Sequence, residues 1–263
     1  MQILQQLRAL HLPAGCWSSS YFNCDFMLVK GRRVNFTGEF FVPGISGERV
    51  EADHFERYRF ACNFAKGKSI LDIACGVGYS APLFIEVGAS SYDGVDLGEK
   101  QIDYAKRHYG SDNVKFHVDN ICTYNGGKSY DLITCFETIE HVDNYLAALE
   151  NLFSLLKPGG MLIISSPNRL ATSPKALSIS SKPSNKYHAQ EFIPEELVLI
   201  LQDQGFSVGQ DDVYGQRQGR IFRSKIMQKI ANIAFGNPKH KASPTIAPIT
   251  NKVPRYFVVV AKK

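Results

Sequence analysis

Short apolar runs alternate with amphipathic stretches along the first two thirds of the chain. The apolar runs predict five β-strands, over residues 69–74, 92–97, 114–118, 130–136 and 160–167. Apolar residues at helical spacing predict three helices between them, over residues 80–88, 99–110 and 143–156. Strands that alternate with helices are typical of βαβ units around a parallel sheet. The pattern therefore predicts an open, doubly wound α/β fold.

The regular pattern ends after the fifth predicted strand. Residues 167–190 are rich in Ser, Pro and Lys, which is typical of a loop over a site. Residues 194–205 predict another helix, with Pro194 in its first turn and Gly205 at its end. A β-rich run over residues 255–263 ends the chain.

Two segments lack a clear period. Residues 1–50 contain aromatic residues and glycines without regular spacing, so we interpret them as a cap or lid. Residues 216–253 are typical of a basic, partly helical insertion. The sequence thus predicts an N-terminal cap over 1–50 and one main domain over 51–263, with 167–190 and 216–253 on the substrate side.

Composition and charge narrow the class of protein. With 263 residues, 44% of them hydrophobic, the chain can bury the core of one large domain. The net charge is +5, and much of the basic excess falls in residues 217–263. A basic segment can bind an anionic partner, but a solvated surface is the commoner explanation, so nucleic acid is disfavoured as a partner.

Cysteine use and the N-terminus bear on the compartment. The six cysteines form no C-x-x-C pair, so the sequence indicates neither a zinc knuckle nor a disulfide framework. The first residues lack the apolar core of a signal peptide, and no apolar run approaches the roughly 18 residues that a membrane span needs. We expect a soluble, cytoplasmic protein without a transmembrane segment, and its oligomeric state stays open.

The stretch LDIACGVGYS, residues 71–80, contains a glycine turn between a predicted strand and a predicted helix. Read as Gly76-x-Gly78-x-x-Ala81, it fits the loose dinucleotide fingerprint, in which small residues let the helix N-terminus approach a phosphate or ribose. Asp72 lies inside the preceding strand, where a carboxylate suits a cationic ligand better than a pyrophosphate. This feature favours a ligand other than the nicotinamide cofactor of a dehydrogenase.

Polar residues also follow the next two predicted strands. Asp96 ends the second strand, where an acid can accept hydrogen bonds from both ribose hydroxyls. Asp119 and Asn120 follow the third strand, where a side-chain acceptor can bind an adenine amino group. The structural alternatives are that Asp72 caps the helix and that Asp119 is an ordinary turn residue.

These pieces form an ordered series. LDIACGVG, GVDLGEKQIDYAK, VDN, YDLITCFETIEHV and LKPGGMLIISSPN resemble, in that order, the class I S-adenosylmethionine (SAM)-dependent methyltransferases over roughly residues 55–210. The resemblance implies a Rossmann-like, mostly parallel sheet of seven strands with an antiparallel last strand, to which 255–263 would belong. It also implies the cofactor-binding residues Arg57, Asp72, Gly76, Gly78, Asp96, Leu97, Asp119, Asn120 and Phe136.

The segment after the fourth strand carries a second constellation. Glu137, Glu140 and His141 stand at i, i+3 and i+4, so a helical turn would put them on one face. With His188 from the later loop, they make a reasonable ligand set for a divalent metal ion, Mg²⁺ or similar. The E-x-x-E-H pattern resembles the ubiquinone-biosynthesis O-methyltransferases and the small-RNA 2′-O-methyltransferases, in which such a metal contacts the hydroxyl that is methylated. Without a metal, His141 or His188 could act as general base, or both could be structural.

The segment FTGEFFVPGISGERVEADHFERYRFA, residues 36–61, bears on the acceptor. It resembles the N-terminal part of bacterial methyltransferases that are associated with surface-polysaccharide enzymes. This likeness implies a sugar hydroxyl or another glycan-linked acceptor, and a SAM contact from Arg57 or Tyr58. The stretch GEFF departs from that pattern, which usually has a basic residue there.

The sequence therefore favours a SAM-dependent methyltransferase that acts on a hydroxyl of a small-molecule or glycan-linked acceptor. One alternative is a nucleic-acid methyltransferase of the RNA 2′-O type, since the E-x-x-E-H motif and the basic segment are compatible with one. The other is a non-catalytic SAM-binding protein. A dehydrogenase is the least favoured class.

Overall fold

The computed structural model describes residues 28–29, 32–33, 48–217, 245–250 and 252–263. The chain divides into two units, Met1–Glu51 and Ala52–Lys263. In the first unit, β1 (Leu28–Val29) and β2 (Arg32–Arg33) form a short antiparallel pair. Most of the predicted cap over 1–50 and most of the predicted insertion over 216–253 lie outside the described residues.

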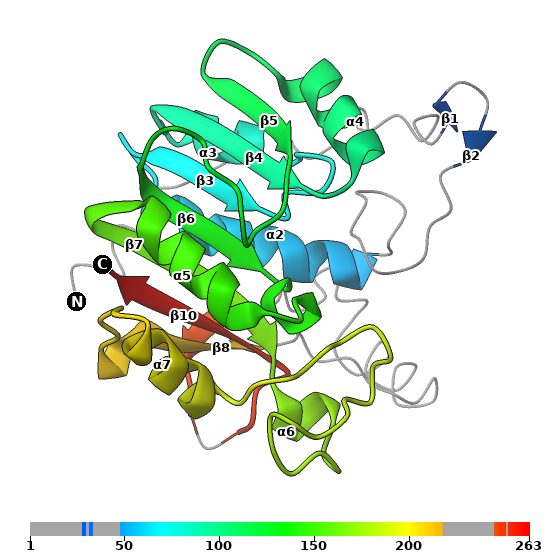
Figure 1. Cartoon of the computed structure of the whole chain (residues 1–263), viewed down its shortest axis with the longest axis vertical. Coiled ribbons are helices and arrows are strands. Elements are labelled where there is room, and N and C mark those ends of the chain that lie inside the picture. The colour runs from blue at the N-terminus through cyan, green and yellow to red at the C-terminus, as the bar shows by residue number, and fades with distance from the viewer. Residues whose placement is uncertain (1–27, 30–31, 34–47, 218–244, 251) are drawn as a thin grey trace, which may run out of the picture. The chain divides into compact units, whose positions relative to one another are not determined.

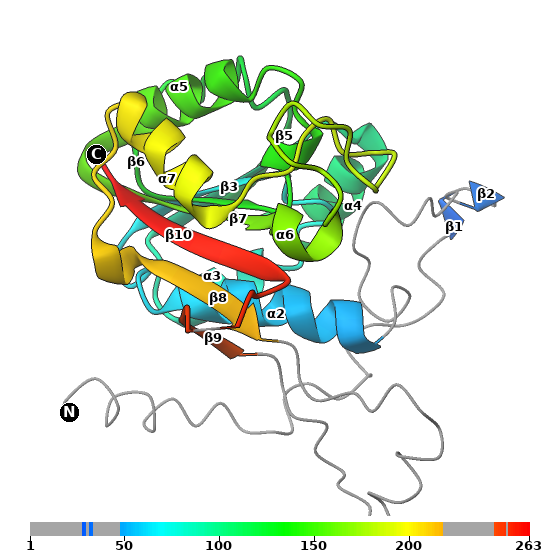
Figure 2. The ribbon, with the colours of Figure 1, turned by 90° about the horizontal axis from the view of Figure 1, so that it is seen from below.

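The second unit is built on one sheet of eight strands, in the order β5-β4-β3-β6-β7-β10-β8-β9. Figure 1 labels the strands from β5 to β8, and Figure 2 shows β9 beside β8. The strands are β3 (Ser69–Ile73), β4 (Ser91–Asp96), β5 (Val114–Val118), β6 (Tyr130–Phe136), β7 (Leu156–Pro167), β8 (Val213–Arg217), β9 (Thr245–Pro248) and β10 (Tyr256–Lys262). The five strands from β5 to β7 are parallel. The predicted mostly parallel α/β sheet is confirmed.

Two predictions concern the antiparallel end of the sheet: the direction of its last strand is confirmed, and the number of strands is wrong. β10 runs antiparallel to β7, with Tyr256 opposite Pro167 and Lys262 opposite Met161, as expected for the last strand. The predicted number of seven strands is wrong, because β9 adds an eighth by pairing antiparallel with β8. The four residues of β9 lie in the predicted insertion and show neither a long apolar run nor alternation.

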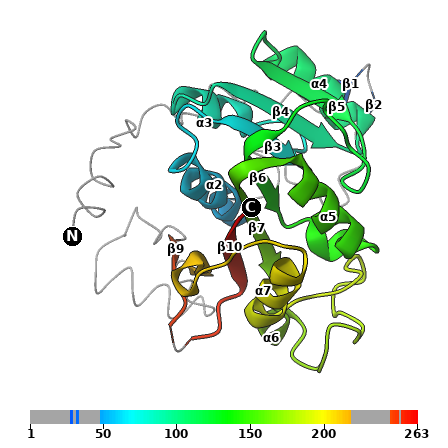
Figure 3. The ribbon, with the colours of Figure 1, turned by 60° about the vertical axis from the view of Figure 1, so that its left-hand side comes forward.

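Helices cover both faces of the sheet. They are α2 (Glu48–Cys62), α3 (Ala81–Glu86), α4 (Glu99–Tyr109), α5 (Tyr145–Leu155), α6 (Arg169–Thr172) and α7 (Pro194–Asp203), with 3₁₀ turns η2 (Ile139–His141) and η3 (Gln210–Asp212). Figure 2 shows α5 and α7 on one face and α2 and α3 on the other. In Figure 3, β6 and β7 pass between α2 and α5. Within the described ranges, every helix is too short or too polar to span a bilayer.

The core lies where the central strands meet these helices. Leu71 and Ile133 from the sheet, Leu152 from α5 and Leu201 from α7 are all fully buried in one apolar cluster. Each side chain of this kind contributes roughly 1.5–3 kcal/mol on burial. The central strands are buried on both faces, which explains their nearly continuous apolar sequences.

The topology determines where the polar side chains gather. The carboxyl ends of the parallel strands share one edge of the sheet, and ligands of open α/β folds bind along that edge. β3 and β6 are direct neighbours there, with Ile73 opposite Cys135. The glycine turn follows β3 and the E-x-x-E-H segment follows β6, so the fold brings the two constellations to one edge.

Candidate functional site

The turn after β3 depends on glycine at two positions. Gly76 and Gly78 have φ of 57° and 76°, a left-handed conformation that glycine adopts without strain. At Gly78, a Cβ atom would lie 2.6 Å from the Phe116 ring and 2.8 Å from Ala105 Cβ, whereas at Gly76 no atom of the described residues lies within 4 Å. Gly78 is therefore needed for packing, and the described part of the chain leaves the backbone surface of Gly76 open.

Asp96 fastens the end of β4 to this turn. Its Oδ2 accepts a hydrogen bond from the Gly76 amide at 2.9 Å, and its Oδ1 accepts one from the Gly98 amide at 2.8 Å. Burial raises the pKa of Asp96, and the two amide donors lower it in part. Leu97, the next residue, is 68% exposed. Asp96 thus holds the turn while its carboxylate stands at the carboxyl edge of the sheet.

Asp72 occupies the interior of the same region. Its side chain is fully buried and accepts hydrogen bonds from the hydroxyls of Ser80 at 2.6 Å, Tyr92 at 2.8 Å, Thr134 at 2.6 Å and Tyr58 at 3.2 Å. Burial raises the pKa of Asp72, and the four hydroxyl donors oppose that shift. These contacts give Asp72 a structural role between α2, α3, β4 and β6, and its predicted contact to a cofactor stays a prediction.

Asp119 and Asn120 form a local turn after β5. Asn120 accepts a hydrogen bond from the Cys122 amide through its side chain at 2.9 Å, and the Asp119 amide donates to the Asp96 carbonyl at 3.2 Å. The two residues therefore lie beside the end of β4, where the sequence predicts the adenine site.

Arg57 from α2 lies close to Glu137, the first residue after β6. Arg57 is 2% exposed, donates through Nη1 to Gln216 Oε1 at 2.6 Å, and lies over the Tyr256 ring at 5.4 Å from its centroid. Its Nη1 is 3.9 Å from Glu137 Oε1. Gln216 and Tyr256 were not anticipated from the sequence, because both belong to strands distant from α2.

The turn after β6 is helical only in part. Glu137 has φ of 49° and precedes the 3₁₀ turn η2, so it does not share a helical face with Glu140 and His141. Its carboxylate instead accepts a hydrogen bond from Ser165 Oγ at 2.7 Å. The expected i, i+3, i+4 face is wrong for Glu137, because the left-handed residue breaks the helical spacing.

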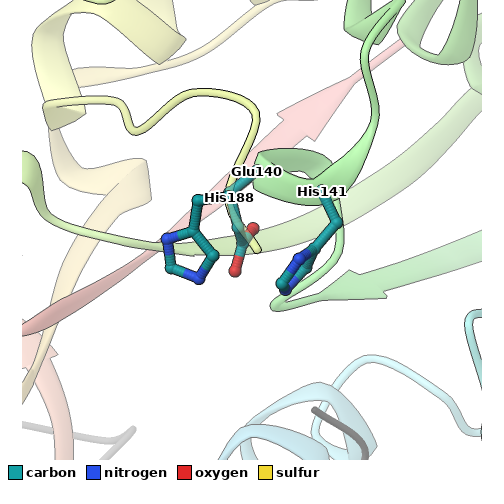
Figure 4. Close-up of side chains that lie close together, drawn as sticks. All are labelled: Glu140, His141 and His188. Carbon is teal, nitrogen blue, oxygen red and sulfur yellow. The ribbon is translucent and has the colours of Figure 1, made fainter. Parts of the chain in front are cut away.

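Three of the four residues proposed as metal ligands come together. Ligand atoms of Glu140, His141 and His188 all lie within 4.8 Å of one another, and Figure 4 shows the three side chains converging. Glu140 is buried, His188 is mostly buried and His141 is exposed. Burial raises the pKa of Glu140 well above its usual range, and the charge of Glu137 raises it further. A bound cation would oppose both effects.

The segment after His188 fixes this geometry. The amides of Ala189 and Gln190 donate to the Glu140 carbonyl, at 2.8 and 3.3 Å. The Gln190 side chain also donates through Nε2 to the carbonyls of Ile139 at 2.8 Å and Val142 at 3.0 Å. Gln190 therefore joins the loop to both the beginning and the end of η2.

Both imidazoles have an acceptor at Nδ1. His141 Nδ1 lies 3.0 Å from the Tyr187 carbonyl, and His188 Nδ1 lies 2.7 Å from Glu191 Oε1. Burial alone would raise the pKa of Glu191, but hydrogen bonds from His188, Thr172 and Ser173 lower it overall. Because a carbonyl and a carboxylate accept, each ring donates through Nδ1, and the neutral form of each ring has its lone pair on Nε2. At His188 this nitrogen lies 2.8 Å from Asn185 Nδ2.

Gln190 and Glu191 are site residues that sequence reasoning missed. They stand in KYHAQEF, two and three positions after His188. A polar pair in an irregular loop has no period, so their spacing to His188 was the only available signal. Two imidazole lone pairs beside a buried carboxylate can hold a divalent ion or accept a proton.

Comparison with known proteins bears on this arrangement. A family model described as "Methyltransferase domain" matches residues 49–210. A protein of Mycolicibacterium smegmatis, described as a probable S-adenosylmethionine-dependent methyltransferase, is 26% identical over 207 residues, which are 74% of this chain and 78% of that protein. The ubiquinone biosynthesis O-methyltransferase of Coxiella burnetii is 36% identical over 107 residues, which are 40% of this chain and 45% of that enzyme.

A solved structure extends the comparison to the fold. The N-methyltransferase NodS of Bradyrhizobium japonicum in complex with S-adenosyl-L-homocysteine has a TM-score of 0.56 at 13% identity. The match covers 83% of this chain and 89% of that one. At this identity the likeness concerns the fold alone.

Proposed function

Because the chain belongs to the methyltransferase-domain family, as a class I enzyme that uses SAM as cofactor, we propose that it transfers the methyl group to a hydroxyl of a small-molecule or glycan-linked acceptor. The observation that carries this proposal is the cluster of Glu140, His141 and His188 after β6. A hydroxyl must lose its proton as its oxygen attacks, so it needs a base or a metal beside it. The likeness to an enzyme named as an O-methyltransferase supports the same acceptor class.

The reaction balances with groups on this chain. A lone pair of the acceptor oxygen attacks the sulfonium methyl in line, so that the C–O bond forms as the C–S bond breaks. The sulfur keeps the bonding electrons, and SAM becomes S-adenosylhomocysteine. The hydroxyl proton passes to Nε2 of His141 or His188, since Nδ1 of each ring already donates to a fixed acceptor. At His188 the proton would replace the hydrogen bond that Nε2 receives from Asn185.

The same donor set fits a divalent metal ion. Glu140, His141 and His188 would hold it, and two nitrogens with one carboxylate suit Mn²⁺ or Zn²⁺ better than Mg²⁺, which prefers oxygen ligands. When bound, the ion would lower the pKa of the acceptor hydroxyl and orient its oxygen. Glu137 was predicted as one of four ligands, but it lies outside this cluster, so we propose three protein ligands with positions left for the acceptor.

The first test is calorimetric titration of SAM into chelator-treated protein, alone and with Mg²⁺, Mn²⁺ or Zn²⁺, beside elemental analysis of untreated protein. A metal that is found in the protein, and that His188→Ala no longer holds, supports the metal site. In a methyl-transfer assay of the same chelator-treated protein, activity that survives the removal of metal supports a histidine base.

The second test identifies the acceptor class. Pools of phenols, glycans and primary amines are incubated with SAM, and S-adenosylhomocysteine and methylated products are detected by mass spectrometry. We expect product only from hydroxyl acceptors, and a loss of about 10²–10⁴-fold in His141→Ala. His108→Ala, a change at an exposed histidine on α4, is the matched control. Methylation of amines but not hydroxyls would overturn the proposal.

A further inference from the structure

The His188 imidazole is held at both nitrogens by residues of its own short segment. Nδ1 lies 2.7 Å from Glu191 Oε1, and Nε2 lies 2.8 Å from Asn185 Nδ2. The His188 side chain is 9% exposed and that of Glu191 is 1% exposed. A buried carboxylate lies at one ring nitrogen and an amide donor at the other. Together they determine which nitrogen of the neutral ring carries the proton.

The two contacts agree on one tautomer. The carboxylate accepts, so the ring proton resides on Nδ1, and Nε2 then carries the lone pair that receives the Asn185 amide. The second oxygen of Glu191 accepts a hydrogen bond from Thr172 Oγ1 at 2.6 Å. Because Thr172 ends α6, which directly follows β7, the carboxylate is anchored to the sheet and not only to the loop.

We propose that Glu191 is a positioning residue that fixes His188 as the Nδ1-protonated tautomer and thereby makes Nε2 the working nitrogen of the site. This inference rests on the proposed function, since it assigns a role to Glu191 in that same site. It applies to either chemistry. A general base accepts the proton at the Nε2 lone pair, which an acceptor hydroxyl or a metal ion would take over from the Asn185 amide. A metal-ligating histidine characteristically donates its other N–H to a carboxylate or carbonyl.

Of the two acceptors at the histidine Nδ1 atoms, only the Glu191 side chain can be removed by substitution. His141 is held in the same tautomer by the backbone carbonyl of Tyr187, which substitution cannot remove. Glu191 does the equivalent for His188 through a side chain. The tautomer tests whether Glu191 determines which ring nitrogen carries the proton. A merely structural contact would not change kcat or metal affinity, so these quantities separate the two roles.

The experiment reads the tautomer directly. The full chain, labelled with ¹⁵N at histidine and freed of metal by a chelator, is studied by long-range ¹H–¹⁵N correlation at a pH where the rings are neutral. His188→Gln identifies the His188 signals. In the wild-type protein we expect a protonated Nδ1 and an unprotonated Nε2, and a ring protonated at Nε2 would overturn the proposal without any further variant.

The variants test the role of Glu191. Glu191→Leu removes the acceptor and should shift the ring toward the Nε2-protonated form, whereas Glu191→Gln keeps a carbonyl acceptor and should restore the Nδ1-protonated form. Glu195→Leu, at an exposed glutamate in the first turn of α7, is the matched control and should change neither signal. An unchanged tautomer in folded Glu191→Leu would overturn the proposal.

Activity provides the second readout. Glu191→Leu should lower kcat, or the affinity for Mn²⁺ or Zn²⁺, by about 10–100-fold, with little change in KM for SAM. If no hydroxyl acceptor is methylated and the tautomer behaves as expected, the proposed function fails and the role of Glu191 stands. If methyl transfer to a hydroxyl is found and the tautomer is independent of Glu191, the proposed function stands and the role of Glu191 fails.

Discussion

The imidazole rings of His141 and His188 lie edge to face, with centroids 4.8 Å apart and an interplanar angle of 85°. One ring comes from the turn after β6 and the other from the loop before α7. The loop is hydrogen-bonded to the turn through the Ala189 and Gln190 amides and the Gln190 side chain. Residues that join loop and turn should therefore affect catalysis without touching a ligand.

Gln190 is the first such residue. Gln190→Ala removes two hydrogen bonds and leaves the carbonyls of Ile139 and Val142 without that donor. Gln190 is 7% exposed, so an unsatisfied buried group should lower the free energy of unfolding by about 1–3 kcal/mol. Urea denaturation measures this loss, and turnover should fall because η2 and the loop separate.

Gln202→Ala provides the control for that change. Gln202 lies exposed on α7, so its loss should change the free energy of unfolding by less than about 0.5 kcal/mol. Equal stability of the two variants would show that the Gln190 hydrogen bonds are not needed to hold the loop.

The two glycines of the turn after β3 should respond differently to alanine. Gly78→Ala combines a left-handed backbone with a Cβ 2.6 Å from the Phe116 ring, so strain of about 1–2 kcal/mol and overpacking of about 1–3 kcal/mol add. Among the residues that the structure describes, Gly76→Ala brings its new Cβ within 4 Å of no atom, so backbone strain is its cost there. We expect Gly78→Ala to be the less stable variant in thermal unfolding.

SAM affinity should not follow that order. If the open surface over Gly76 receives the cofactor, Gly76→Ala will weaken SAM binding in calorimetry by more than its small loss of stability implies. A Gly76→Ala variant with normal SAM affinity would remove Gly76 from the cofactor site.

Asp96→Asn tests the proposed ribose contact. The variant keeps one acceptor oxygen for Gly76 or Gly98 but loses the charge, and hydrogen bonds to charged groups contribute about 1.5–3 kcal/mol. The Kd for SAM should therefore rise by about 10–100-fold. Asp103→Asn, an exposed change on α4, should leave the Kd unchanged. A folded Asp96→Asn variant with unaltered Kd would contradict the placement.

The sequence predicted the parallel part of the sheet well, because each strand is a buried apolar run. The strands β5 and β6 have the predicted bounds, and β4 differs by one residue at each end. β9 escaped prediction because four exposed or half-buried residues produce no apolar run. Its place is set by pairing with β8, which is a tertiary contact.

The site was predictable only in part for a similar reason. Glu140, His141 and His188 could be singled out by residue type and motif. That Glu137 would adopt a left-handed backbone could not, since non-glycine residues seldom do so. Glu191 and Gln190 act through contacts across the fold, to α6 and η2, and spacing along the chain does not determine such contacts.

A last prediction concerns acid stability and lies outside the site. Asp131 at the start of β6 accepts hydrogen bonds from the Ser69 amide at 2.9 Å and hydroxyl at 2.6 Å, and from Lys157 Nζ at 2.8 Å. Burial alone would raise the pKa of Asp131, but hydrogen bonds from Lys157 and Ser69 outweigh it and lower the pKa to about 2. The carboxylate therefore joins β3, β6 and the beginning of β7.

The sign of the pH effect follows from that shift. Because the folded pKa is lower than the unfolded one, Asp131 stabilises the fold above the unfolded pKa, near 4, and this contribution is lost as the pH falls through about 2. Solvent screening limits it to about 1 kcal/mol. In urea unfolding, Asp131→Asn should be less stable than the wild-type protein at neutral pH, and the difference should shrink between about pH 4 and pH 2. Asp112→Asn, at an exposed aspartate, should show no such convergence; a gap for Asp131→Asn that stays constant with pH would show that the Lys157 and Ser69 contacts do not stabilise the charged form.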